Sequence, residues 1–236
     1  MGRILKIRDM KKILIAMMLL IGAITYGQDS IFVYKGDVMM VGDSALGWTA
    51  DEVVANIVTD DFNSYTTATT LHSQTNWNQV GANHVFNCTG TTINPNTDTG
   101  TEGYILNYYS GTFNDDQYAE LEISGNEATF IGPSVRCSTG ENGYHIIVNA
   151  NSIYVLKMVD GSITSLGDGS PPDYAGTVKI TAVGTTISCY WDDVLMSFLS
   201  GGTGVYTDSD LSSGNPGVTG RGQLGKSGDN FEGGDL

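Results

Sequence analysis

Short alternating segments separated by turn residues are the feature that most limits how this chain can fold. After residue 28 no stretch repeats its apolar residues with the period of a helix. Apolar and polar residues instead alternate over short runs, and clusters of Gly, Asn, Asp, Ser and Thr separate these runs at intervals of about 8 to 12 residues. The chain has 31 Gly and 5 Pro, which suits many tight turns. The pattern predicts an all-β fold, an antiparallel β-sandwich of the jelly-roll type with a short N-terminal extension.

The strand candidates in chain order are "NIVTDDF", "HVFNC", "GYILNYY", "QYAELEI", "PSVRCS", "GYHIIVN", "SIYVLKMV", "TVKITAV", "TTISCYW", "VLMSFL" and "DNFEGG". Tight links join several of them, so consecutive hairpins are expected to form a long antiparallel meander over residues 144–199. Within it Tyr154, Leu156 and Met158 fall on one strand face and Lys157 falls on the other. One of these faces is expected to be core and the other wetter.

Residues 1–28 have the composition of a secretory signal. Basic residues precede an apolar run from Ile13 to Ile24, and a short polar exit follows before Asp29. A run of roughly 12 apolar residues is short for a bilayer span, so a cleaved leader is favoured over a membrane anchor. We therefore expect a bacterial protein that is secreted or held at the cell surface, with no stable membrane span.

Acidic residues dominate the rest of the chain. Residues 29–236 contain 6 basic and 25 acidic residues, a formal charge of −19. Such a surface repels phosphate backbones, so nucleic acid is not expected as a partner. Calcium, cationic surfaces and neutral polymers stay open as partners.

The three cysteines are Cys88, Cys137 and Cys189, and an odd number in an exported chain leaves at least one thiol outside any internal bridge. Strand alternation places Cys137 on one face with Val135 and Cys189 on one face with Ile187. Both are expected to be small core residues. Buried free thiols are therefore favoured over a bridge between Cys137 and Cys189.

Residues 29–56 precede the regular pattern of strands. The stretch "IFVYKGDVMMVG" reads as five residues, the turn pair Gly36 and Asp37, and five more, which predicts a hairpin. Two roles stay open for it. The hairpin packs on its own sandwich, or it lends a strand to a neighbouring copy, because an unpaired strand edge is a template for another chain.

An ordered series of motifs carries a family resemblance. The series is "DDF", "NDDQYAELEI", "GPSVRCS", "GYHIIVNANSIYVLKMVDG", "AGTVKITAVGTTISCYWDDVLMSF", "TDSDLSSGNPGV" and "DNFEGGDL". Over residues 57–236 it resembles the concanavalin A-like lectin/glucanase superfamily, in the form of the laminin-G-like jelly-roll domains of secreted bacterial proteins. The resemblance implies that the first and last strands lie near each other, so Phe62 and Phe231 are expected to enter one core.

Many members of this superfamily are glycosidases, and the resemblance implies a carboxylate pattern of the type E-x-D-x-E for them. This chain has Glu120 and Glu122 in "AELEIS", with Ser124 at the third position. Alternate residues of a strand share a face about 6.6 Å apart. Hydrolysis needs a carboxyl pair flanking the scissile bond, and matched glucanases draw that pair from the outer members of the pattern. Because Ser124 replaces one of them, a non-catalytic protein is favoured.

A sugar-binding face is expected where aromatic and polar side chains meet. Tyr118 accompanies Glu120 and Glu122 on one strand face, and Arg136 and His145 are expected on the same polar sheet face. An aromatic ring supports the apolar side of a sugar, and polar atoms hold its hydroxyls. These five residues form the candidate glycan site. Ordinary β packing is the alternative interpretation, since strands favour Tyr regardless of function.

Pairs of acidic residues suggest a metal site. The resemblance implies one calcium near the terminal strands, and calcium takes six to eight oxygen ligands. If the termini meet, the candidate ligands are Asp60, Asp61, Asp229 and Glu232. Turn chemistry is the competing explanation, because Asp is common in turns. Calcium is therefore a candidate cofactor.

The leading hypothesis is a secreted, non-catalytic β-sandwich that binds glycan or mediates surface adhesion. The alternative is a structural subunit of a self-assembling extracellular filament that uses residues 29–56 as a donated strand. A glycoside hydrolase that uses Glu120 and Glu122 ranks third.

Overall fold

The computed structural model describes residues 30–34, 37–41, 55–81, 84–97, 103–222 and 225–236. The chain divides into two units, Met1–Val54 and Ala55–Leu236. The predicted leader, residues 1–28, lies outside the described residues. Within the described ranges, no helix has the length and apolar character needed to cross a membrane.

The first unit contains two antiparallel strands, β1 (Ser30–Tyr34) and β2 (Asp37–Val41). Ser30 lies opposite Val41 and Tyr34 lies opposite Asp37. The prediction that Asp37 belongs to the turn was wrong, because Asp37 is the first residue of β2.

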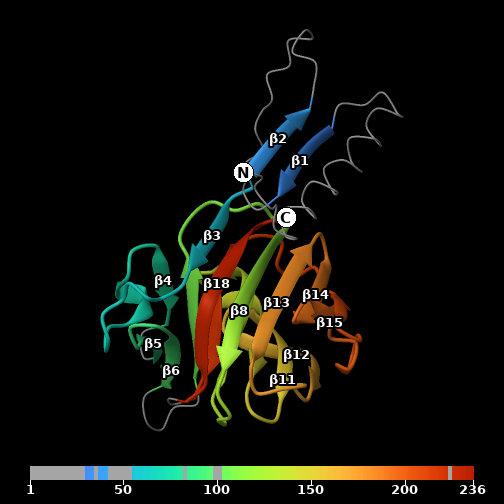
Figure 1. Ribbon diagram of the computed structural model, residues 1–236. Coiled ribbons are helices and arrows are strands. Elements are labelled where there is room, and N and C mark those ends of the chain that lie inside the picture. The colour runs from blue at the N-terminus through green and yellow to red at the C-terminus, as the bar shows by residue number, and fades with distance from the viewer. Residues whose placement is uncertain (1–29, 35–36, 42–54, 82–83, 98–102, 223–224) are drawn as a thin grey trace, which may run out of the picture. The chain divides into compact units, whose positions relative to one another are not determined.

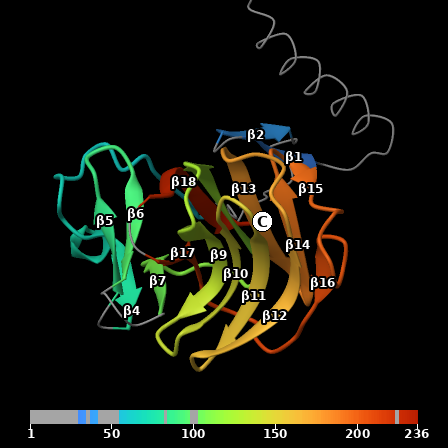
Figure 2. The same ribbon diagram turned by 90° about the horizontal axis from the view of Figure 1, so that it is seen from below.

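The second unit consists of two antiparallel sheets stacked as two layers (Figures 1 and 2), which confirms the predicted β-sandwich. The nine-stranded sheet has the order β15-β14-β13-β8-β18-β6-β5, with β16 also paired to β14 and β3 to β18. Its strands are β3 (Ile57–Asp60), β5 (His84–Cys88), β6 (Ile93–Thr97), β8 (Gln117–Ser124), β13 (Gly176–Val183), β14 (Thr186–Trp191), β15 (Val194–Leu195), β16 (Val205–Thr207) and β18 (Ser227–Asp235).

The seven-stranded sheet has the order β12-β11-β10-β9-β17-β7-β4. Its strands are β4 (Trp77–Val80), β7 (Tyr104–Tyr109), β9 (Phe130–Ser138), β10 (Asn142–Val148), β11 (Ile153–Val159), β12 (Ser162–Gly169) and β17 (Asn215–Arg221). A short 3-10 turn, Leu71–Ser73, precedes β4.

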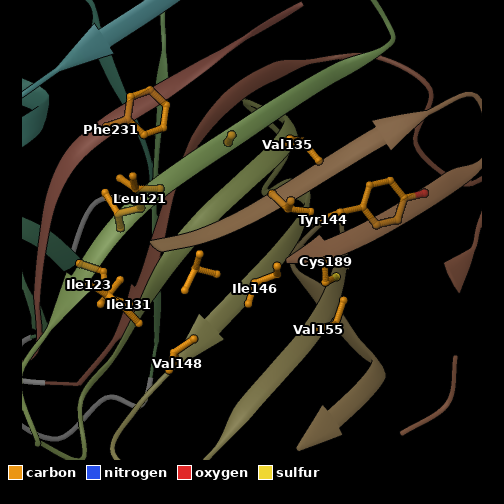
Figure 3. Close-up of a cluster of buried hydrophobic side chains, with 14 of the residues drawn as sticks. Leu121, Ile123, Ile131, Val135, Tyr144, Ile146, Val148, Val155, Cys189 and Phe231 are labelled. Carbon is orange, nitrogen blue, oxygen red and sulfur yellow. The ribbon is translucent and has the colours of Figure 1, made fainter. Parts of the chain in front are cut away.

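The core lies between the two sheets and is built from alternate residues of each strand. Figure 3 shows this cluster, with Leu121 and Ile123 from β8 and Ile146 and Val148 from β10, all fully buried. Burial of one such side chain contributes about 1.5–3 kcal/mol to the free energy of folding. The period-two alternation seen in the sequence is therefore what holds the layers together.

The first and last strands of the sandwich pair directly, with β18 between β3 and β8 (Figure 1). Phe62 and Phe231 are both buried in the same core, as predicted. The Trp77 ring joins them, with centroid distances of 6.2 Å to Phe62 and 5.0 Å to Phe231.

The predicted meander over residues 144–199 is interrupted. The β10–β11 and β13–β14 hairpins form, but β12 pairs with β11 in one sheet and β13 pairs with β8 in the other. No strand was predicted over Ser162–Gly169, because this edge strand is mostly polar and exposed. On β11 the core face belongs to Ile153 and Val155, and Lys157 lies on this same face opposite Tyr144.

All three cysteines are free and buried, which confirms the prediction made for Cys137 and Cys189. The expected face of Cys137 was wrong, since Val135 lies in the main core whereas Cys137 packs with Val80 and Leu106 in a second cluster. The cause is a bulge in β9. Arg136 has φ +55°, and the register with β10 and β17 shifts there by one residue, which reverses the alternation.

Arg136 itself is a buried structural cation, 1% exposed. Its Nε donates to the Asp115 carbonyl at 3.1 Å, and its Nη2 donates to the same carbonyl at 3.0 Å and to that of Gly184 at 2.7 Å. Its Nη1 donates to the Leu211 carbonyl at 2.7 Å. One guanidinium therefore ties three separate segments to β9.

Replacing this cation tests its structural role. Arg136→Met should lower the free energy of unfolding by about 3 kcal/mol or more, because three carbonyls lose their donors and each buried unsatisfied group costs about 1–3 kcal/mol. Lys179→Met is the control, since Lys179 is half-buried with its Nζ 3.3 Å from Glu120 Oε2. It should cost about 1 kcal/mol or less, because a partly exposed ion pair contributes little to stability. Equal losses in urea unfolding of the two variants would contradict this account.

Candidate functional site

A bulge in the last strand assembles the candidate site. Asn230 has φ +47°, a left-handed conformation that Asn adopts more readily than most residues. The register between β18 and β8 shifts between Asp229 and Glu232. As a result Phe231 enters the core, while Asp229 and Glu232 both lie on the outer face of the nine-stranded sheet.

The bulge creates two pairs of like charges across β8 and β18. Asp229 lies opposite Glu122, and Glu232 lies opposite Glu120. Like charges directly opposite each other in a sheet are destabilising. This arrangement opposes folding, so its presence on one face points to a use other than stability.

Three neighbouring groups hold these carboxylates in place. The Tyr118 hydroxyl donates to Glu232 Oε1 at 2.7 Å, and Asn230 Nδ2 donates to Glu122 Oε2 at 2.8 Å. Lys179 Nζ lies 3.3 Å from Glu120 Oε2. The glutamates therefore have fixed positions, and the outer face still carries more negative than positive charge.

Asp229 is the carboxyl group that this crowding affects most clearly. Burial raises the pKa of Asp229 above its usual range, and the nearby charges of Glu122 and Asp61 raise it further. The hydrogen bond from the Asn230 backbone N–H acts in the opposite direction but is outweighed. A proton is thus held more tightly at Asp229 than at an ordinary aspartate.

Asp60, the last residue of β3, also belongs to the site and accepts three hydrogen bonds. Its Oδ1 accepts a hydrogen bond from the Phe62 N–H at 2.9 Å. Its Oδ2 accepts from Trp77 Nε1 at 2.7 Å and from the Tyr65 hydroxyl. Burial raises the pKa of Tyr65, and the contact with Asp60 raises it further, so the phenol stays protonated and remains a donor.

Residues from β3, β8 and β18 line an open cleft of about 660 Å³, which we call the acidic cleft. Its lining contains carboxylates, hydroxyls, amides and two tyrosine rings: Thr59, Asp60, Asp61, Ser64, Tyr65, Thr75, Asn76, Tyr109, Glu120, Asn230, Phe231 and Glu232. Carboxylates accept hydrogen bonds, hydroxyls and amides donate and accept them, and tyrosine rings offer apolar surface. The lining suits a polyhydroxylated ligand.

The predicted metal ligands come together here but do not form a cage. Asp60, Asp61 and Glu232 line the cleft, and Asp229 lies beside Glu122. Both oxygens of Asp60 and one of Glu232 already accept hydrogen bonds. Within the described part of the chain, no three His, Cys, Asp or Glu residues are placed to share an ion. Calcium stays a prediction from the resemblance, and the residues present do not fit it.

The predicted glycan residues divide between the two sheets. Tyr118, Glu120 and Glu122 share the outer face of β8, but Arg136 and His145 belong to the seven-stranded sheet. The expectation of one common face was wrong because β8 and β9, adjacent in sequence, belong to different layers. Tyr118 is 6% exposed and supports Glu232 rather than offering an open ring.

His145 lies on the outer face of the seven-stranded sheet but is buried there. Its Nδ1 is 2.8 Å from Ser134 Oγ, and burial lowers the pKa of its imidazole to about 3, so the ring is neutral. The prediction of a wetter environment was therefore wrong. Part of the same face is filled by the cluster of Val80, Leu106 and Cys137.

Sequence reasoning missed several cleft residues, among them Asn230, Tyr65 and Tyr109. One signal for Asn230 was present in "SGDNFEGG", where Asp229 and Glu232 lie three residues apart and so break the alternation around Phe231. Tyr65 and Tyr109 come from segments far apart in the chain. Their meeting depends on the pairing of distant strands.

No protein-family model matches the chain, and no curated protein matches its sequence. Several solved structures share its fold. The carbohydrate binding module CBM66 from Bacillus subtilis is 19% identical, with 67% of this chain and 95% of that chain covered and a TM-score of 0.52. A Bacillus subtilis protein of unknown function with a galectin-like fold is 11% identical, with 75% and 94% covered and a TM-score of 0.52.

A third structure is the exoplasmic/lumenal domain of VIP36 in its Ca²⁺/Man3GlcNAc-bound form. It is 10% identical, with 76% of this chain and 90% of that chain covered and a TM-score of 0.50. At such identities the similarity concerns the fold. The unit Ala55–Leu236 therefore shares its two-layered β-sandwich fold with these three structures.

Proposed function

We propose that the chain is an exported glycan-binding module and that the acidic cleft is its binding site. The observation that carries the proposal is the pair of like-charge contacts, Asp229 with Glu122 and Glu232 with Glu120, beside an open polar cleft. Sugar hydroxyls donate hydrogen bonds to carboxylates, which spreads the negative charge and offsets part of the repulsion. The ligand class is supported by two structures with the same fold, a carbohydrate binding module and the VIP36 domain with bound Man3GlcNAc.

Export and surface attachment belong to this proposal as well. Their support is the leader-like composition of residues 1–28 and the excess of acidic residues in the remainder. The strongly negative surface favours a neutral polymer over an acidic one as the ligand, because like charges repel.

Binding should depend on the cleft carboxylates and not on charge in general. A glycan array identifies the ligand, and calorimetry then compares Glu120→Gln with the wild type. We expect at least tenfold weaker binding, about 1.4 kcal/mol, because a hydrogen bond to a charged group is worth about 1.5–3 kcal/mol. The matched control is Asp193→Asn, which removes one charge from an exposed turn whose φ of +63° suits Asn.

Three outcomes of this comparison would contradict the proposal. They are no ligand on a broad array, equal weakening by the two variants, or full affinity of Glu120→Gln. Release of reducing sugar by the wild type that is lost in Glu120→Gln would instead identify a glycoside hydrolase.

Repulsion between Glu122 and Asp229 should lower the free energy of unfolding of the wild type. Glu122→Gln keeps an oxygen that accepts from Asn230 and removes the charge opposite Asp229. At pH 7 we expect the variant to be about 0.2–1 kcal/mol more stable than the wild type in urea unfolding.

The pH dependence of this gain follows from the raised pKa of Asp229. A raised carboxyl pKa gives stability that is present below the unfolded-state value of about 3.9 and is lost as the pH rises through the folded-state value. The advantage of Glu122→Gln should therefore fade as the pH is lowered to about 3.5, because the raised pKa makes Asp229 take up its proton at a higher pH than an ordinary aspartate does. A gain of equal size at both pH values, or a loss at pH 7, would contradict the electrostatic account.

A further inference from the structure

The charged groups that line the acidic cleft are all of one sign. The carboxylates are Asp60, Asp61, Glu120 and Glu232, and none of the described residues in the lining is Lys, Arg or His. Lys179 does not line the cleft but contacts one of these groups, with its Nζ 3.3 Å from Glu120 Oε2. A cleft lined by one sign of charge concentrates ligands of the opposite sign. The lining therefore favours a cationic ligand.

Three of these carboxylates still have an oxygen that can accept a hydrogen bond. Asp61 Oδ1 accepts from the Asn63 N–H at 3.1 Å, and Glu232 Oε1 accepts from the Tyr118 hydroxyl at 2.7 Å. Glu120 contacts its cation through Oε2. The second oxygen of each group accepts no hydrogen bond from any residue that the structure describes. Hydrogen bonds from Asn63 lower the pKa of Asp61, so this group is ionised at neutral pH.

The charge of a ligand decides how much of the repulsion in the cleft it relieves. A sugar hydroxyl donates one hydrogen bond and adds no positive charge. An ammonium group donates three hydrogen bonds and also carries a full positive charge. Hydrogen bonds that involve ionised groups are roughly twice as strong as those between neutral groups. A ligand with ammonium groups therefore gains more from these carboxylates than a neutral sugar of the same shape.

The rest of the lining limits which cation fits. Tyr65 and Tyr109 contribute rings, which attract cations and also support the apolar side of a sugar. The Tyr109 ring is held by Trp77 at a centroid distance of 5.4 Å, and its hydroxyl accepts from Asn76 Nδ2 at 3.0 Å. Hydroxyl and amide side chains complete the lining and can bond to sugar hydroxyls. The combination suits a sugar that carries positive charge.

We propose that the acidic cleft binds sugars with free amino groups in preference to the same sugars in acetylated form. This inference rests on the glycan-binding function proposed above and names its ligand class, an oligomer or polymer of an amino sugar such as glucosamine. The ammonium groups of the ligand bond to the carboxylate oxygens of Asp61, Glu120 and Glu232, while its rings lie against tyrosine. The cleft volume of about 660 Å³ is within the usual range of ligand sites.

The test compares two ligands that differ in charge. Calorimetry measures the affinity of the full chain for the tetramer of glucosamine and for the tetramer of N-acetylglucosamine, at about pH 6, where amines are charged and carboxylates are ionised. At about 0.01 M salt we expect the glucosamine tetramer to bind at least about tenfold more tightly. At about 1 M salt the Debye length falls from about 30 Å to about 3 Å, so this preference should fall severalfold.

Two variants separate the charge of the cleft from its structure. Asp61→Asn keeps an oxygen that accepts from the Asn63 N–H, and it should weaken binding of the glucosamine tetramer roughly threefold. Lys179→Met removes the cation that competes for Glu120, and it should strengthen binding of that tetramer roughly threefold. A damaged fold would weaken binding, so it does not explain a gain. Asp193→Asn, in an exposed turn, is the control and should change neither affinity.

Equal affinity for the two tetramers, tighter binding of the acetylated one, or no gain in Lys179→Met overturns this inference and leaves the glycan-binding function standing. Binding of another glycan but of neither tetramer does the same. Tetralysine that binds as tightly as the glucosamine tetramer also overturns it, because charge alone then decides binding. If neither tetramer nor any array glycan binds, the inference and the proposed function fail together.

Discussion

The position of β18 between β3 and β8 is the interaction on which the rest of the structure depends. Along this one strand, Phe231 enters the core while Glu232 and Asp229 face outward. The pairing of β18 with its neighbours therefore builds part of the core on one face of the sheet and part of the acidic cleft on the other face. Because the last strand must find the first strand and β8, these contacts span most of the chain, and such non-local pairing slows folding.

In the acidic cleft, hydrogen bonds hold the carboxylates in fixed positions although the like charges of β8 and β18 repel each other. Asp60 is held by the Phe62 N–H, the Trp77 indole and the Tyr65 hydroxyl, so the wall that carries it is tied to the core. On the facing strands, two like-charge pairs stay close together with Lys179 as a nearby cation. Sites that bind or react often keep such locally unfavourable arrangements, because removing them gains stability at the expense of function.

The sandwich was predictable from sequence because the signal for it is local. Alternation in segments such as "AELEIS" and "GYHIIV" shows which residues face the core, and turn residues mark the hairpins. The pairing of the terminal strands followed from the family resemblance. The strand β12 was missed because an exposed polar edge has no apolar alternation to detect.

The details of the site were harder to predict, for two physical reasons. A bulge adds one residue and reverses every face beyond it, so Arg136 and Asn230 changed the orientation of Cys137 and of Glu232. Sequence order also does not reveal where the chain crosses between layers. Arg136 and His145 were therefore assigned to the face of Glu120, although their strands belong to the other sheet.

Mapping of the bound glycan on the protein tests the central claim most directly. Amide chemical shifts are recorded by NMR while the oligosaccharide that the array identifies is added to the wild-type chain. The account predicts that the largest changes fall on β3, β8 and β18, at residues such as Thr59, Glu120 and Asn230. Changes concentrated on the outer face of the seven-stranded sheet, around Phe130 and Tyr154, with none at the acidic cleft, would contradict it.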